Sequence, residues 1–490
     1  MHIPFLSIII AIPLIAGLAI LLLPKEQKQA VKLVALAASG LTFFLSVWVY
    51  FSYNITKAGY QFVEKVAWVP GFGISYYVGV DGFSVPLVLL AGVVLLCGVL
   101  VSWGIEDRPR EFYAFLMFLG TSVFGVFASL DLFELFFFFE LAVFPKYLMI
   151  AVWGSPKTRE YGAMKLTLYL FIGSVVALVG ALAMFFSSGK LTFDMLVLEQ
   201  TGFPLAFQHL WFPVVFLGFA VLGGLFPFHN WAPDGHVAAP TAVSMLLAGV
   251  EMKVGAFAAL RVAIMLLPEG AKYWAPWILG LATVNVVYGA AIAMVQTDIK
   301  YVIGFSSVSH MGLVMIGFAS LNRDGLMGAG MQMFSHGIMT ALFFSVVGMV
   351  YDRAHTREIN ALGGLFKKIP WAAIGFIIAG LVSMGMPGFS GFVAEFPIFM
   401  GVWRVQPWVA IIAVLGVIIT AAYIFRLITR VFFGDIPPEL DASVSDITIK
   451  DKVVVGLLAT LMVALGLFPT LMVPMLQSGV DHIMRLLGGA

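Results

Sequence analysis

Residues 115–128 read FLMFLGTSVFGVFA, an apolar run without a single charged side chain. Runs of roughly 18 to 25 such residues recur along the chain, and each is long enough to cross a hydrocarbon core of about 30 Å as a helix. Helices satisfy their own backbone polar groups in lipid, whereas a β-barrel requires alternating segments of about ten residues. The sequence therefore predicts an all-α polytopic membrane protein.

Composition supports this class. Of 490 residues, 61% are hydrophobic and 11% are charged, and the mean hydropathy is +1.02, far from the values of a soluble domain. The single cysteine, Cys97, lies inside an apolar run, which excludes disulfides, cysteine-ligated iron-sulfur clusters and zinc fingers. The net charge of +1 and the lack of a P-loop or a strand-helix GxGxxG fingerprint indicate no nucleotide or nucleic-acid site.

We expect fourteen transmembrane helices. The first follows no basic segment and precedes no small-residue cleavage pattern, so it is interpreted as a retained helix and not as a signal peptide. The expected spans are 4–23, 31–52, 83–103, 112–129, 132–152, 161–186, 210–235, 240–262, 275–297, 301–320, 328–350, 371–400, 408–432 and 452–475.

Two of these spans are interrupted by helix breakers: the seventh by Gly223-Gly224 and Pro227, the twelfth by the run from Gly385 to Gly391. Broken helices at corresponding positions in two halves are typical of inverted repeats with an ion path at the breaks. A chance kink is the alternative. The breaks are five spans apart, and an odd shift reverses topology. The sequence thus predicts helices 1–3 in residues 1–110, a first repeat (helices 4–8) in 111–265, an inverted second repeat (helices 9–13) in 270–435, and helix 14 in 436–490.

Basic residues in the connections predict the orientation. The connections after odd-numbered spans carry most of them, which places these connections in the cytoplasm and both termini, including Gly489, outside. We expect an energy-transducing membrane, the bacterial cytoplasmic membrane. The residues counted are Lys25, Lys28, Lys32, Arg108, Arg110, Lys157, Arg159, Arg353, Arg357, Lys367, Lys368, Arg430, Lys450 and Lys452.

A few ionisable residues lie deep inside expected spans. Such residues are costly in lipid and therefore indicate function. Acids, amines and imidazoles can take up and pass on protons when their surroundings tune them, so the set predicts a proton relay. Its members are Glu140, Lys253, His310, His336 and Glu395.

Each candidate also has a structural interpretation. The acids and the lysine could be paired charges that lock helices together, and the histidines could be packing residues. Glu251 and Lys253 are about 200° apart on one helix, so they should not pair and each needs its own partner. His229 and His236 could suggest a metal, but their spacing favours ordering of the loop after the seventh span. We expect no metal or cofactor site in this chain.

Three blocks make the sequence similar to a known family. They are FELFFFFELAVFPKYLMIAVWG (133–154), FHNWAPDGHVAAPTAVSMLLAGVEMKVG (228–255) and QTDIKYVIGFSSVSHMG (296–312). With MQMFSHG and MPGFSGFVAEFPIF, they resemble the antiporter-like membrane subunits of complex I, the proton-pumping NADH:quinone oxidoreductase, and within them the chain M or chain 4 type. The match spans residues 131 to 400, and the span count extends it to nearly the whole chain.

The resemblance implies a hydrated axis of protonatable groups through the membrane. It assigns Glu140 to the family's fifth-span glutamate, Lys253 to its eighth-span lysine, His310 and His336 to its central histidines, and Glu395 to its twelfth-span acid. Glutamate at that last position is typical of chain M, whereas the sister L and N chains and the antiporter subunits carry lysine. The implied partners are L- and N-type chains, with FMN, iron-sulfur clusters and quinone in other subunits.

One residue departs from the family pattern. The lysine that should pair with the fifth-span glutamate falls on Leu222. Either this half-channel is impaired, or Lys146 supplies the missing charge; we favour Lys146, because it lies about 9 Å from Glu140 along the same helix axis. The sequence thus predicts a Lys146 to Glu140 pair as part of the relay. The alternative is that Lys146 snorkels to the membrane surface.

The sequence allows four functions. The favoured one is a proton-translocating subunit that couples quinone reduction to pumping, an enzyme subunit without its own redox site. A subunit of a multisubunit sodium/proton antiporter is disfavoured by Glu395 and the PDGH loop. The membrane arm of an energy-converting hydrogenase is poorly distinguished from complex I. A passive scaffold that no longer conducts protons remains an alternative, because Leu222 replaces the lysine of the family pattern.

Overall fold

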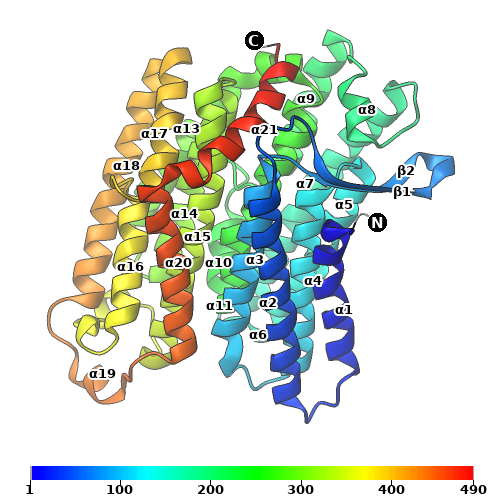
Figure 1. Ribbon diagram of the computed structural model, residues 1–490. Coiled ribbons are helices and arrows are strands. Elements are labelled where there is room, and N and C mark those ends of the chain that lie inside the picture. Colours follow the sequence, from blue (N-terminus) through cyan, green and yellow to red (C-terminus); the bar gives the residue numbers. More distant parts are fainter. Residues whose placement is uncertain (1–2, 489–490) are drawn as a thin grey trace.

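The computed structural model describes residues 3–488 and shows a bundle of long helices (Figure 1). Within these residues, twelve helical segments are long and apolar enough to cross a membrane. The expectation of an all-α membrane fold is confirmed. The segments are Phe5–Leu22, Lys28–Ser52, Ser84–Gly104, Pro109–Ala128, Leu132–Trp153, Arg159–Ser187, Leu205–Leu222, Thr241–Ile264, Pro268–Val295, Ile299–Ala319, Arg323–Ala354 and Pro407–Phe432.

The long helices overlap the predicted spans, although several of their boundaries differ from the predicted ones by five residues or more, and some short helices lie between the predicted spans. The first nine are α1 (Phe5–Leu22), α2 (Lys28–Ser52), α3 (Ser84–Val101), α4 (Pro109–Ala128), α5 (Leu132–Leu141), α6 (Val143–Trp153), α7 (Arg159–Ser187), α8 (Met195–Glu199) and α9 (Leu205–Leu222). The next six are α10 (Trp231–Ala238), α11 (Thr241–Leu246), α12 (Met252–Ala258), α13 (Pro268–Val295), α14 (Ile299–Ala319) and α15 (Arg323–Ala354). The last six are α16 (Pro370–Ser383), α17 (Ser390–Val405), α18 (Pro407–Leu427), α19 (Pro438–Ser443), α20 (Ile449–Leu467) and α21 (Val473–Leu486).

Both predicted helix breaks are present. α9 ends at Leu222 and α10 starts at Trp231, while α16 ends at Ser383 and α17 starts at Ser390. A glycine with positive φ lies in each break, Gly224 at 73° and Gly385 at 63°, a conformation that glycine adopts without steric cost. The count of fourteen spans and the inverted repeats remain predictions.

The last predicted span, 452–475, is wrong at its end. α20 stops at Leu467 and a separate helix, α21, begins at Val473. Pro469 explains the stop, because a proline lacks a backbone donor and forces the residue before it out of the helical region; Phe468 has φ −127° and ψ 67°. Gly489, expected outside, lies beyond the described residues.

A β-hairpin was not foreseen from the apolar pattern. Strands β1 (Gln61–Val69) and β2 (Ile74–Val80) pair antiparallel. In Figure 1 the hairpin projects from the end of the bundle across which α21 lies, and α19 is at the opposite end. The hairpin and α21 therefore belong to the same side of the membrane.

The centre of the bundle is formed by two segments that are enclosed over most of their length. Every residue is buried in the most apolar 18-residue window of both Thr241–Ile264 and Arg323–Ala354. α14 packs against α15 and is also almost wholly buried. Polar side chains on these elements are consequently shielded from lipid by the surrounding helices.

Candidate functional site

The segment Thr241–Ile264 places two ionisable groups in the bundle centre. It contains a π-helical turn, η3 (Leu247–Glu251), between α11 and α12. Glu251 ends this turn and Lys253 follows two residues later, and their exposed fractions are 1% and 0%. Single π-helical turns are frequent at functional sites. The two side chains find separate partners, as the angle between them predicted.

Lys253 contacts a histidine of α15. Its ammonium nitrogen lies 2.8 Å from Nδ1 of His336 and also donates to the carbonyl of Ala248 in η3. His336 is 1% exposed, and its other ring nitrogen has no hydrogen-bond partner among residues 3–488. The π-helical turn thus helps to hold the ammonium against the imidazole.

The second histidine continues the path towards α17. The ring centroids of His336 and His310 are 5.3 Å apart. Nδ1 of His310 lies 3.3 Å from a carboxylate oxygen of Glu395, and its Nε2 lies 3.0 Å from the hydroxyl of Ser383. Four of the residues predicted from the sequence, Lys253, His336, His310 and Glu395, therefore form one buried row, in which the two imidazole rings are neighbours but share no direct hydrogen bond within residues 3–488.

Gln332 is a member of this row that sequence reasoning missed. Its amide nitrogen lies 3.2 Å from Nδ1 of His310 and donates to Glu395 at 3.3 Å. Gln332 precedes His336 by four residues, so the two share one face of α15. That spacing, in an otherwise apolar helix, is the signal that could have identified it.

The break before α17 brings the backbone close to Glu395. A Cβ atom on Gly385 would lie 2.8 Å from a carboxylate oxygen of Glu395, in addition to the strain of its positive φ. Only glycine fits there without displacing the acid. The twelfth-span break thus shapes the pocket in which the last carboxylate of the row sits.

Lys146 does not pair with Glu140 as predicted. It forms an ion pair with Glu251, and both side chains are 2% exposed. The alternative that Lys146 snorkels to the surface is also wrong, because the side chain points into the bundle. The predicted partner was wrong because α6 turns this face towards η3, a packing relation between residues 105 positions apart.

Glu140 lies apart from both groups. It is partly exposed, and within the described part of the chain it makes no side-chain hydrogen bond or ion pair. Leu222, where a lysine was expected, lines a small cavity together with Ser122, Lys146 and Glu251. The position without a lysine therefore adjoins the observed ion pair.

His229, which precedes α10, and His236, which lies within α10, both pack against aromatic rings. His229 stacks on Phe226 with centroids 5.5 Å apart, and His236 lies 5.4 Å from the ring of Phe344. None of their ring nitrogens has a hydrogen-bond partner in residues 3–488. Over the same residues, no group of three or more His, Cys, Asp or Glu side chains could hold a metal ion.

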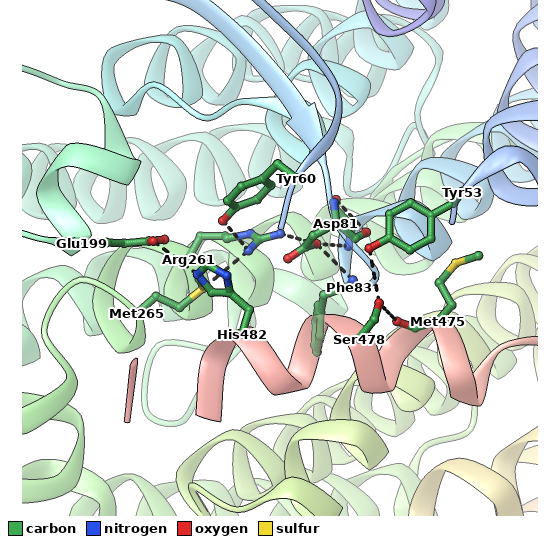
Figure 2. A network of polar contacts seen from close by, with 11 residues as sticks. Tyr53, Tyr60, Asp81, Phe83, Glu199, Arg261, Met265, Met475, Ser478 and His482 are labelled. Atoms are coloured by element: carbon green, nitrogen blue, oxygen red, sulfur yellow. Dashed lines mark hydrogen bonds and ion pairs between the residues drawn. The ribbon is translucent and has the colours of Figure 1, made fainter. Parts of the chain in front are cut away.

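A second buried network lies near the hairpin and was not anticipated (Figure 2). Arg261 forms an ion pair with Asp81 at 2.5 Å and donates to the hydroxyl of Tyr60 at 3.0 Å. Arg261 belongs to a second π-helical turn, η4 (Ala259–Ile264), and Asp81 directly follows β2. Burial opposes ionisation of Asp81, but the neighbouring guanidinium outweighs it and lowers the pKa of this carboxyl. His482 of α21 lies 3.3 Å from Glu199 beside them.

Comparison with known proteins places the chain in a family. Residues 129–420 match the family model described as "NADH:quinone oxidoreductase/Mrp antiporter, TM". The chain belongs to this family. NADH-quinone oxidoreductase subunit M of Rhodobacter capsulatus is 37% identical over 497 residues, which cover 98% of this chain and 96% of the relative. NAD(P)H-quinone oxidoreductase chain 4 of a Nostoc species is 36% identical over 480 residues, covering 96% and 89%.

Solved structures agree with this assignment. A chain of respiratory complex I from Thermus thermophilus has a TM-score of 0.91 at 29% identity, covering 99% of this chain and 100% of that chain. A chain of the Mrp complex from a Dietzia species has a TM-score of 0.88 at 19% identity, with both chains covered completely. The second likeness shows the shared fold alone. The resemblance drawn from the sequence blocks is confirmed.

Proposed function

We propose that this protein is a proton-translocating subunit in the membrane arm of a complex I-type NADH:quinone oxidoreductase, where it couples quinone reduction to proton pumping. The buried row of protonatable side chains from Lys253 through His336 and His310 to Glu395 carries this proposal. Relatives that share 36–37% of its residues are named as quinone oxidoreductase subunits. The likeness to the Mrp complex, at 19% identity, makes a sodium/proton antiporter the weaker candidate, and an energy-converting hydrogenase is the remaining one.

The residues suggest how a proton would move. Lys253 can release a proton to Nδ1 of His336 along their 2.8 Å contact, leaving a neutral amine and an imidazolium. The proton can then pass from His336 to His310, and from His310 to the carboxylate of Glu395, one oxygen of which lies 3.3 Å from Nδ1 of His310. Imidazole and carboxylate groups suit this task because burial and neighbouring charges tune their proton affinity. Glu140 and Lys146 complete the proposed relay set.

The proposal includes a setting for the chain. Its partners would be L- and N-type antiporter-like subunits, and FMN, iron-sulfur clusters and quinone would reside in other subunits. We place it in the bacterial cytoplasmic membrane with both termini outside and with the domain boundaries expected from the sequence. The hairpin and α21 would then face the outer side.

The proposed function is tested at Glu395. In Glu395→Gln the side chain keeps its size but can no longer hold and release a proton, so we expect proton pumping by the assembled complex to fall by about tenfold or more, a barrier increase of about 1.4 kcal/mol. Pumping and electron transfer would be measured in vesicles containing the whole complex. Glu26→Gln, on an exposed connection, is the matched control and should pump normally. An unchanged proton-to-electron ratio in Glu395→Gln would contradict the proposed relay.

The orientation can be tested by cysteine labelling. The sole native cysteine, Cys97, is fully buried, so introduced cysteines report with little background. Phe72→Cys, at the hairpin tip where the side chain is 67% exposed, should react with an impermeant maleimide from outside intact cells. Asp435→Cys, exposed near α19, should react only after the membrane is opened. The reverse pattern would overturn the orientation inferred from basic residues.

A further inference from the structure

The imidazole of His310 has hydrogen-bonding partners on both of its nitrogens. Its Nε2 lies 3.0 Å from the hydroxyl of Ser383, the last residue of α16 before the break. Its Nδ1 lies 3.2 Å from the amide nitrogen of Gln332 and 3.3 Å from a carboxylate oxygen of Glu395. All four side chains are buried. These partners therefore decide which ring nitrogen carries the hydrogen of the neutral imidazole.

Hydroxyl groups continue the contact from Ser383 to α18 and α14. A side-chain hydrogen bond joins Ser383 to the hydroxyl of Tyr423. The Tyr423 hydroxyl donates its single hydrogen to Ser306 at 2.7 Å, so it can only accept from Ser383. The Ser383 hydroxyl then has no hydrogen left for the imidazole, because a serine hydroxyl carries only one. Ser383 consequently accepts a hydrogen bond from Nε2 of His310.

The other side of the ring leads to the same assignment. The amide nitrogen of Gln332 donates to Glu395 at 3.3 Å and also faces Nδ1 of His310. An amide nitrogen carries two hydrogens and is not an acceptor, so Nδ1 must offer a lone pair to it. Both sides of the ring therefore indicate a neutral His310 with its hydrogen on Nε2.

This tautomer creates a position for one proton between His310 and Glu395. The lone pair of Nδ1 faces a carboxylate oxygen 3.3 Å away, and two acceptors at this distance need a proton between them. The proton can reside on Nδ1, as an imidazolium beside a carboxylate, or on Glu395, as a carboxylic acid beside a neutral imidazole. If the neutral ring carried its hydrogen on Nδ1 instead, that nitrogen would have no lone pair for an arriving proton.

We propose that Ser383 and Tyr423 are positioning residues that keep His310 in the Nε2–H tautomer, so that Nδ1 is the atom that exchanges protons with Glu395. A proton that reaches Nδ1 forms an imidazolium, whose Nε2–H remains bonded to Ser383. Nδ1 then releases this proton to the carboxylate, which becomes a carboxylic acid, and the ring returns to its starting tautomer. The inference deepens the proposed function and rests on it.

Removal of the Ser383 hydroxyl is the first test. In Ser383→Ala the buried Nε2–H loses its acceptor, which favours the opposite tautomer, with the hydrogen on Nδ1 and bonded to Glu395. Proton pumping by the complete complex in vesicles should fall by about tenfold or more, while the amount of assembled complex stays native. A Ser383→Ala complex that pumps at the native rate would overturn the proposal.

Ser307→Ala is the matched control for this variant. Ser307 is also fully buried and belongs to the same serine-rich stretch of α14 as Ser306, but it donates to the carbonyl of Ile303 in its own helix. Its hydroxyl has no contact with His310, so this variant should pump normally. A loss of pumping in Ser307→Ala as large as that in Ser383→Ala would show that any buried serine of this region matters, and would contradict tautomer control.

A conservative variant separates the hydroxyl from the packing of the side chain. Ser383→Thr keeps the hydroxyl and should pump within about threefold of the native rate. Packing alone gives no reason for threonine to pump better than alanine at this position. If assembled Ser383→Thr and Ser383→Ala complexes pump equally poorly, the hydroxyl does not control His310 and the proposal fails.

The role of Tyr423 is tested by non-additivity. In Tyr423→Phe the Ser383 hydroxyl loses its acceptor and can turn its hydrogen towards Nε2, so pumping should fall by about threefold or more. Because Tyr423 acts through Ser383, the double variant Ser383→Ala/Tyr423→Phe should pump no worse than Ser383→Ala alone. Losses that multiply would indicate two independent structural effects and would overturn the proposal. Tyr113→Phe removes a buried hydroxyl that donates to the carbonyl of Ser102, and as a control it should pump normally.

Glu395→Gln in the same series distinguishes failure of the inference from failure of the proposed function. If Glu395→Gln pumps normally, the proposed function itself fails. If Glu395→Gln loses pumping while Ser383→Ala does not, only the control of the His310 tautomer fails.

Discussion

Complexes that carry Lys253→Met are expected to lose about a hundredfold or more of their pumping activity, the usual scale for removing a group that transfers protons. The side chain is fully buried and is the link between η3 and His336. Methionine has nearly the same length but carries no proton, so the row that leads to Glu395 would have no donor at its start. Electron transfer should slow as well, because the two processes are coupled in the proposed complex.

Two further variants make this result specific. Lys253→Arg keeps the positive charge, but a guanidinium does not release its proton in proteins, so pumping should remain low. Lys272→Met removes a lysine whose side chain is 43% exposed in a pair with Glu269, and it should pump normally. If Lys253→Arg pumped at the native rate, the positive charge alone would be required, and the proposed role of Lys253 in proton transfer would be contradicted.

The largest effect on stability is expected at the Arg261 and Asp81 pair. Arg261→Met leaves the carboxylate of Asp81, which is 4% exposed, without its cation, and breaking a buried pair in this way costs about 3–5 kcal/mol. The loss should appear as a lower Tm and a lower yield of assembled complex. Arg261→Met/Asp81→Asn removes both charges and should recover most of the loss.

The pH dependence of this effect follows from the sign of the shift. The folded-state pKa of Asp81 is lowered from its usual 3.8, so the pair stabilises the fold at neutral pH and this contribution is lost as the pH falls through that lowered pKa. In Arg261→Met burial raises the pKa of Asp81, and protonation then relieves the penalty. The difference in Tm between native protein and variant should therefore narrow on acidification.

A surface pair provides the control. Arg323 and Asp481 are 54% and 47% exposed at a distance of 2.9 Å, and such pairs contribute about 0–1 kcal/mol. Arg323→Met should consequently change the Tm very little. If Arg323→Met lowered the Tm as much as Arg261→Met does, burial would not be what determines the cost of breaking an ion pair.

The sequence by itself determined the class of fold and most of the relay candidates. Long apolar runs can only be helices in lipid, and the Gly/Pro runs at 223–227 and 385–391 mark the two broken helices. Ionisable residues so deep in apolar spans require partners. For that reason Lys253, His310, His336 and Glu395 could be selected from the sequence, and the structure brings them together.

Only the tertiary structure decided which partner each charge takes. The sequence shows that Lys146 needs a counter-charge. It does not show that Glu251 supplies it, because that depends on how α6 packs against a π-helical turn 105 residues away. The same holds for Arg261. Its partner Asp81 lies at the end of a β-hairpin that the apolar pattern of the sequence did not predict. The cost of burying a charge is a local property of the residue, whereas the compensation comes from helix rotation and packing across the whole bundle.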